Sequence, residues 1–140
     1  MLLDLHNDIE VRRAISPLTG TDDTAFVSQI IDMANRTSLE FVIATGTLAD
    51  VDATFTALVE HGDNSALSDA AAVPDADLLG TEAGAGFTFG DDNETRKIGY
   101  IGDKRYVRLT VTPANNTGSA PVSAVAILGG ARKQPQSSQG

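Results

Sequence analysis

The sequence contains no cysteine and no tryptophan, and only 5% of its residues are aromatic. Without cysteine, disulfide bonds, thiolate metal ligands and thiol nucleophiles are excluded, and the composition fits a reducing compartment. No apolar run approaches the ~20 residues that a membrane-spanning helix needs, and the N-terminus lacks a signal-peptide pattern. We therefore expect one soluble domain without a membrane partner, because 140 residues, 41% of them hydrophobic, can bury a real core.

Basic residues are missing from the middle of the chain. Residues 50–94 contain eleven acidic residues and no lysine or arginine, whereas residues 1–49 carry a charge of −4 and residues 95–140 a charge of +6. The net charge of −9 disfavours nonspecific binding to DNA or to anionic membranes. The charged segments either neutralise one another across neighbouring strands or form a polar face for a partner of complementary charge.

The hydrophobic pattern is that of β-strands. Alternation at 51–59 and 107–112 is typical of strands with one buried face, whereas 39–44 and 121–128 are apolar on both sides and are predicted to be covered or central strands. Shorter strands are predicted at 9–15, 25–32, 87–89 and 96–101. About eight short strands separated by polar turns predict an all-β fold, an antiparallel β-sandwich or jelly roll, over residues 9–129.

Three segments do not follow this alternation. Residues 63–86, rich in Ala, Asp, Ser and Gly, are predicted to be a long loop with one or two helical turns at 65–72. Residues 1–8 are predicted to be an N-terminal arm, because no strand accommodates the apolar group Leu2, Leu3 and Leu5. Residues 130–140 are polar and are predicted to be a flexible C-terminal tail.

Motifs with catalytic or ligand-binding chemistry are scarce. His6 and His61 lie in no metal-binding spacing, and the sequence has no Gly-x-Ser-x-Gly motif. The glycine-rich run 80–86 precedes a predicted strand rather than a helix, so it does not fit a phosphate site. Acidic clusters at 75–77 and 91–94 supply oxygen ligands without the spacing of a calcium loop. We therefore expect no enzymatic activity, no cofactor and no metal.

The aromatic residues give little support for a nucleic-acid site. Tyr100 and Tyr106 lie near several basic residues, a composition found on nucleic-acid-binding surfaces. No recognised motif accompanies them, and the acidic remainder of the chain opposes such binding, so we expect no direct nucleic-acid partner. Four phenylalanines occupy apolar registers and are predicted to be in the core: Phe41, Phe55, Phe87 and Phe89.

Residues 97–108 contain the pattern Lys-x-Gly-Tyr-x-Gly-x-Lys-Arg-Tyr-Val-Arg. With the segments at 38–50, 59–65 and 77–81, this pattern resembles small proteins encoded by tailed phages and prophages. These proteins are in turn similar to capsid cement or decoration proteins, in particular the jelly-roll type of a Bordetella phage. The resemblance covers roughly residues 9–132 and carries over no catalytic residue.

The resemblance implies a structural protein of the virion. Such a protein binds the outside of a tailed-phage capsid and cements neighbouring subunits of the major capsid protein, after assembly in the bacterial cytoplasm. A homodimer at a local symmetry axis is also expected. The candidate capsid contacts are Leu2, Leu3, Leu5, Arg96, Lys97, Lys104, Arg105, Tyr106, Arg108, Arg132 and Lys133. Two alternatives stay open, namely a virion-surface module that binds carbohydrate or the host, and a calcium-stabilised adhesion module.

Overall fold

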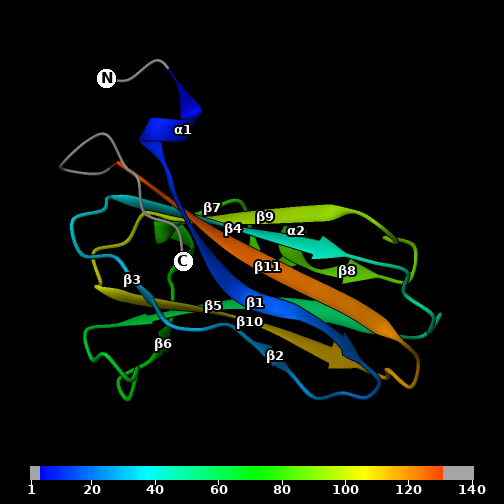
Figure 1. Ribbon diagram of the computed structural model, residues 1–140. Coiled ribbons are helices and arrows are strands. Elements are labelled where there is room, and N and C mark those ends of the chain that lie inside the picture. The colour runs from blue at the N-terminus through cyan, green and yellow to red at the C-terminus, as the bar shows by residue number, and fades with distance from the viewer. Residues whose placement is uncertain (1–3, 131–140) are drawn as a thin grey trace.

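The computed structural model describes residues 4–130 and shows two β-sheets packed face to face (Figure 1). The strands are β1 (Glu10–Gly20), β2 (Phe26–Val27), β3 (Ile31–Asp32), β4 (Ser38–Thr45), β5 (Thr54–Gly62), β6 (Ala71–Ala72), β7 (Leu78–Leu79), β8 (Phe87–Thr88), β9 (Thr95–Tyr100), β10 (Tyr106–Ala114) and β11 (Ala120–Gly129). The helices are α1 (Leu5–Asp8), a 3-10 turn η1 (Asp75–Asp77) and α2 (Glu82–Ala85).

The strand order is that of a jelly roll. The first sheet has the order β1-β11-β4-β9-β7, and the second has the order β2-β10-β5-β6, with β3 also paired to β10 and β8 to β5. All of these pairs are antiparallel. The chain crosses from one sheet to the other at every connection except those between β2 and β3 and between β5 and β6. The predicted jelly-roll sandwich is therefore confirmed, and the predicted strand at 25–32 is divided into β2 and β3.

The core lies between the two sheets and is filled by the inward-facing residues of the long strands. Phe41, Val59, Leu109 and Leu128 are each 0% exposed and come from β4, β5, β10 and β11. Burying one such side chain stabilises the fold by about 1.5–3 kcal/mol. Alternation along each strand places these residues on one face, so both sheets contribute to one continuous core.

The segment predicted as a long loop closes one side of the sandwich instead. Strand β6 pairs with β5, β7 pairs with β9, and α2 contacts both β5 and β9. Val73, Leu78 and Ala85 of this segment are buried in the core. The helical turns predicted at 65–72 are wrong, because hydrogen-bonded turns around Leu67, which has a φ of 53°, occupy that position.

Three residues lie elsewhere than the alternation predicts. Val51 is 68% exposed, because the Asp50 carboxylate accepts the N–H of Asp52 and the chain turns there before β5 begins. Phe89 is 38% exposed, since β8 ends at Thr88. Tyr100, grouped with the basic residues as a surface aromatic, is fully buried.

Candidate functional site

The outer face of the first sheet is apolar along its two central strands. Val42 and Ala44 of β4 lie opposite Val125 and Ser123 of β11, and these side chains point away from the core. Ile127 lies on the same face, and Val125 is 39% exposed. Polar residues are expected on the solvent face of an antiparallel sheet, so this face has the composition of a surface that contacts another molecule.

The outer face of the second sheet is mixed. Its exposed positions include Thr54 and Thr56 of β5 and Thr112 of β10, together with Leu58 and Val27, which are 37% and 54% exposed. An ion pair between Arg108 and Glu60, at 3.0 Å, lies on the same face. The first sheet is the candidate binding face because its outward apolar side chains are contiguous along two central strands, whereas threonines and an ion pair accompany Leu58 and Val27 on the second sheet.

The candidate face is uneven, because it has two hollows and an exposed leucine lines each of them. A hollow of about 340 Å³ is lined by Glu40, Leu79, Gly80 and Lys97, and Leu79 is 53% exposed. The other, of about 260 Å³, lies where β1, β4 and β11 meet, and Leu18 in its lining is 59% exposed. Projections and hollows on one face allow close packing against a matching surface.

Lys97 is the predicted contact residue that lies on this face. It is exposed on β9, directly opposite Val42 of β4, and it lines the 340 Å³ hollow together with Glu40. Lys97 therefore belongs both to the 97–108 sequence pattern and to the apolar face.

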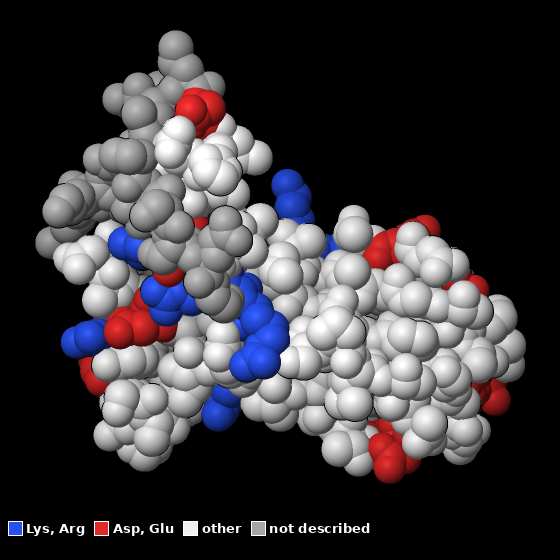
Figure 2. Space-filling view, viewed as in Figure 1, with Lys and Arg blue, Asp and Glu red and all other residues white. Residues whose placement is uncertain are grey.

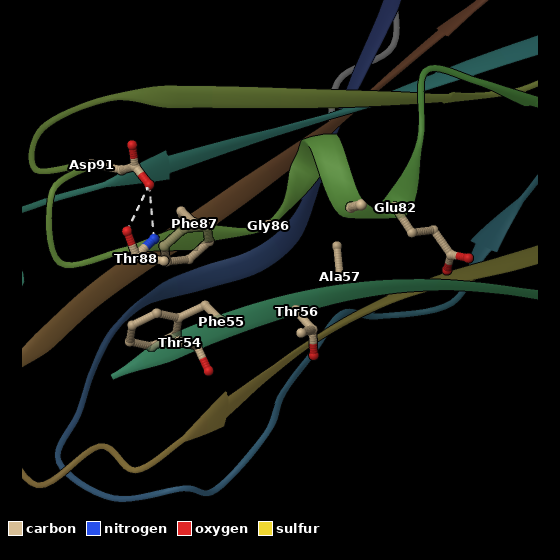
Figure 3. A pocket seen from close by; sticks show the side chains of 10 residues that line it. Thr54, Phe55, Thr56, Ala57, Glu82, Gly86, Phe87, Thr88 and Asp91 are labelled. Carbon is tan, nitrogen blue, oxygen red and sulfur yellow. Dashed lines mark hydrogen bonds between the residues drawn. The ribbon is translucent and has the colours of Figure 1, made fainter. Parts of the chain in front are cut away.

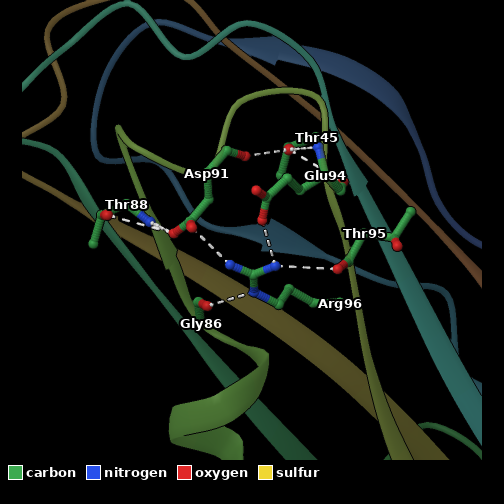
Figure 4. A network of polar contacts seen from close by, with 7 residues as sticks. All are labelled: Thr45, Gly86, Thr88, Asp91, Glu94, Thr95 and Arg96. Carbon is green, nitrogen blue, oxygen red and sulfur yellow. Dashed lines mark hydrogen bonds and ion pairs between the residues drawn. The ribbon is translucent and has the colours of Figure 1, made fainter.

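Arg96, the neighbouring residue, is held within the domain (Figure 4). Its guanidinium lies 2.7 Å from the Asp91 carboxylate and 2.8 Å from that of Glu94, and its Nε donates to the Gly86 carbonyl. These contacts raise the pKa of Arg96, with the Glu94 hydrogen bond as the main cause. Arg96 thus ties the 86–94 segment to β9.

Within residues 4–130, the remaining basic candidates are also engaged in ion pairs. Lys104 pairs with Asp63 at 3.0 Å, and Arg105 makes two hydrogen bonds to Asp32, at 3.0 and 3.1 Å. Arg105 also lies 5.2 Å from the ring of Tyr106, and Arg108 pairs with Glu60. For these residues the structure favours neutralisation across neighbouring strands over a free basic surface.

The four arm and tail candidates Leu2, Leu3, Arg132 and Lys133 lie outside the described residues. Leu5 lies on α1, which projects beyond the sandwich (Figure 1), and its side chain is 72% exposed. The Asp4 carboxylate caps this short helix by accepting the Asn7 N–H.

Charge is distributed unevenly along the sandwich. In the view of Figure 2, the basic side chains gather toward the end that carries α1, and the opposite end shows only acidic ones. That opposite end holds the turns 20–26, 45–54, 88–95 and 114–120. Its carboxylates bind backbone amides, as Asp50 does with Thr117 and Asp92 with Leu48. These acids therefore stabilise the turns.

A separate open pocket of about 430 Å³ lies between β5, α2 and β8 (Figure 3). Phe55 and Phe87 stack beside it with ring centroids 4.7 Å apart. The Glu82 carboxylate accepts the Val59 N–H at 2.8 Å, and Asp91 accepts the Thr88 N–H at 2.8 Å. The two carboxylates in its lining thus already accept hydrogen bonds from the protein's own backbone.

A buried pair that the sequence did not reveal anchors the 101–105 turn. The Tyr100 hydroxyl lies 2.9 Å from His61 Nδ1 and accepts the Lys104 N–H at 3.0 Å. Burial raises the pKa of Tyr100 to about 12, so the hydroxyl stays protonated and can donate to the histidine.

Among residues 4–130 no group of three or more His, Asp or Glu side chains is arranged to hold a metal ion, and no helix there is long and apolar enough to cross a membrane.

Glu40 gives the candidate face a testable electrostatic property. Burial raises the pKa of Glu40, although the charge of Lys97 partly offsets this effect. A carboxyl with a raised pKa stabilises the fold less as pH rises through that pKa. We expect Glu40→Gln to have a higher Tm than the wild type at pH 7. The difference should shrink toward about pH 3.5, where the carboxyl is largely protonated in both states. Thermal unfolding at the two pH values measures this, and an equal difference at both would contradict it.

No family model matches the sequence, and no curated protein matches it either. Among solved structures, the chain is similar to a chain of infectious bursal disease virus, Gx strain, with a TM-score of 0.55 and 12% identity over 91% of this chain and 33% of that one. It is also similar to a chain in the capsid of Ralstonia phage GP4, with a TM-score of 0.47 and 11% identity over 99% and 90% of the two chains. A xylan-binding module, CBM15, gives a TM-score of 0.46 and 12% identity over 94% and 96%.

These similarities concern the fold. At such low identity, the match to the infectious bursal disease virus chain supports the β-sandwich, and the two weaker matches add no argument. The chain spans a third or less of the length of several chains that it matches. A shared fold does not by itself identify a function.

Proposed function

We propose that this chain is a structural protein of a tailed-phage virion, which binds the outside of the capsid and cements neighbouring subunits of the major capsid protein. The observation that carries the proposal is the apolar outer face of the first sheet, formed by Val42, Ala44, Val125 and Ile127. The choice of partner rests on the resemblance of residues 97–108 and the flanking segments to tailed-phage cement proteins.

The architecture suits this role physically. A rigid sandwich holds the binding face in a fixed shape, so little conformational entropy is lost when the face meets the shell. Each contact can be modest, because many copies on one shell, each touching two capsid subunits, strengthen the particle together. No residue takes a catalytic role in this proposal. Two copies at a local two-fold axis of the shell form the proposed dimer.

Particles that lack this chain test the cementing role. We expect them to release their DNA at a lower temperature than complete particles, and to regain the original temperature when the purified chain is added. The release can be followed with a DNA-binding dye during heating. Equal release temperatures with and without the chain would refute the role, and binding of the free chain to a glycan array but not to shells would favour a carbohydrate-binding module.

A further inference from the structure

Strand β9 has a partly open edge. On one side, all six of its residues pair with β4, from Leu39 opposite Tyr100 to Ala44 opposite Thr95. On the other side, β7 pairs only with Tyr100 and Gly99. Within residues 4–130, no strand pairs with residues 95–98 on that side.

The register shows which backbone groups face this edge. Ile101 donates its N–H to the Asp77 carbonyl at 2.9 Å, and Gly99 lies opposite Leu79. Hydrogen-bonded positions alternate along an antiparallel strand, so Lys97 is the next residue to direct its N–H and C=O toward the β7 side. Thr95 follows in the same orientation, but its carbonyl already accepts the Arg96 guanidinium at 3.2 Å (Figure 4), so Lys97 is the open position.

Gly80 ends the pairing with β9. Its φ of 84° is in the left-handed region that glycine adopts readily, and it follows directly on the last residue of β7. A Cβ built on Gly80 would lie 4.0 Å from the Lys97 carbonyl oxygen. The strand pairing thus ends just before Lys97, beside the 340 Å³ hollow of the candidate face, and the chain continues into α2, which still contacts β9.

We propose that this edge of β9 accepts an extended segment of the major capsid protein, which continues the line of β7 and forms main-chain hydrogen bonds with Lys97. Open strand edges are templates for such pairing. The inference rests on the proposed function for the identity of the partner. It adds the mode of attachment, in which main-chain hydrogen bonds at the edge complement apolar contacts on the adjoining face.

The chemistry of the edge favours a partner strand with a carboxylate opposite Lys97. Side chains opposite one another on two strands lie on the same face, and Lys97 is exposed on the outer face. It is also one of the few described basic residues that is not in an ion pair within 4.0 Å. A short acidic or polar strand therefore fits this edge better than a basic one.

Hydrogen exchange tests the pairing in the unaltered protein. Peptides that cover 95–98 should exchange at least tenfold more slowly when the chain is bound to shells of the major capsid protein than when it is free, because the Lys97 N–H becomes hydrogen-bonded. Peptides that cover β2 should exchange at the same rate in both states. Binding to shells without protection at 95–98 would overturn the strand pairing and leave the proposed function standing, whereas failure to bind shells would overturn both.

A proline substitution gives a second test. Lys97→Pro removes the edge N–H, which the domain itself does not use, and Lys97→Ala keeps that N–H but removes the charge. We expect Lys97→Pro to bind shells at least tenfold more weakly than Lys97→Ala in co-sedimentation, with both variants folded by circular dichroism.

Val27→Pro is the matched control. Ser28 donates its N–H to the Leu109 carbonyl, so the alternating register directs the Val27 N–H to the free edge of the second sheet. Val27→Pro should bind shells as the wild type does. Equal binding by Lys97→Pro and Lys97→Ala would overturn the proposal, and if Lys97→Pro does not fold, the hydrogen-exchange result decides.

Discussion

Val125→Asp is expected to bind capsid shells at least tenfold more weakly than the wild type, a loss of about 1.4 kcal/mol or more. Val125 lies on the central strand β11, is 39% exposed and points outward from the apolar face. A carboxylate placed there would be removed from water on binding, which is costly, and the exposed Arg13 directly opposite it on β1 would offset only part of that cost. Binding can be measured by co-sedimentation of the purified chain with shells over a range of concentrations.

The matched control is Thr112→Asp on the outer face of the second sheet. Thr112 is an exposed polar residue on β10, so Thr112→Asp adds the same charge outside the apolar face. We expect it to bind shells as the wild type does, and both variants to keep the wild-type Tm within a few degrees, because neither position belongs to the core. Equal loss of binding in both variants would show that charge in general, rather than the apolar face, governs attachment.

Glu10→Ala is expected to lower the free energy of unfolding by about 3 kcal/mol, the range for breaking a buried ion pair. Glu10 is only 2% exposed at the start of β1, and its carboxylate binds both Arg12 and Arg36. Burial would raise the pKa of Glu10, but the hydrogen bonds from these two guanidiniums outweigh burial and lower it. Removing the carboxylate deprives both arginines of a shared partner. Denaturant unfolding at pH 7 measures the loss.

The pH dependence of this loss follows from the lowered pKa. The Glu10 carboxylate stabilises the fold fully above its pKa in the unfolded chain, about 4.3, and this contribution disappears as pH falls through its lower pKa in the folded protein. The difference between Glu10→Ala and the wild type should therefore shrink below about pH 4. The control is Glu60→Ala, which breaks a partly exposed pair with Arg108 and should cost less than about 1 kcal/mol. Equal costs for the two variants would contradict the special role of burial at Glu10.

The sandwich itself could be predicted from the sequence, because alternation reports directly on burial. The two-sided apolar pattern at 39–44 and 121–128 predicted covered strands, and these strands are the centre of the first sheet. No segment among the described residues covers the outer side of β4 and β11, so the outward apolar side chains of these strands form the exposed apolar face. Val51 and Phe89 were misplaced because turns stabilised by Asp50 and Asp91, rather than the hydrophobic pattern, decide where β5 and β8 begin and end.

The candidate site was only partly predictable. The sequence named Lys97 together with the neighbouring basic residues, but it did not show that those neighbours are neutralised by acidic residues distant in the chain. Arg105 and Asp32 are 73 residues apart, and their pairing depends on the register between β3 and β10. The open edge of β9 depends on the point at which Gly80 ends the pairing with β7, which a single glycine in a loop-like segment does not reveal.

Electron cryomicroscopy of shells mixed with the purified chain tests the central claim most directly. We predict added density on the outside of the shell into which the sandwich fits with its first sheet toward the capsid protein, so that Val125 and Lys97 lie at the contact and Thr112 faces the solvent. Shells without added density, or a sandwich whose second sheet faces the capsid protein, would contradict the account.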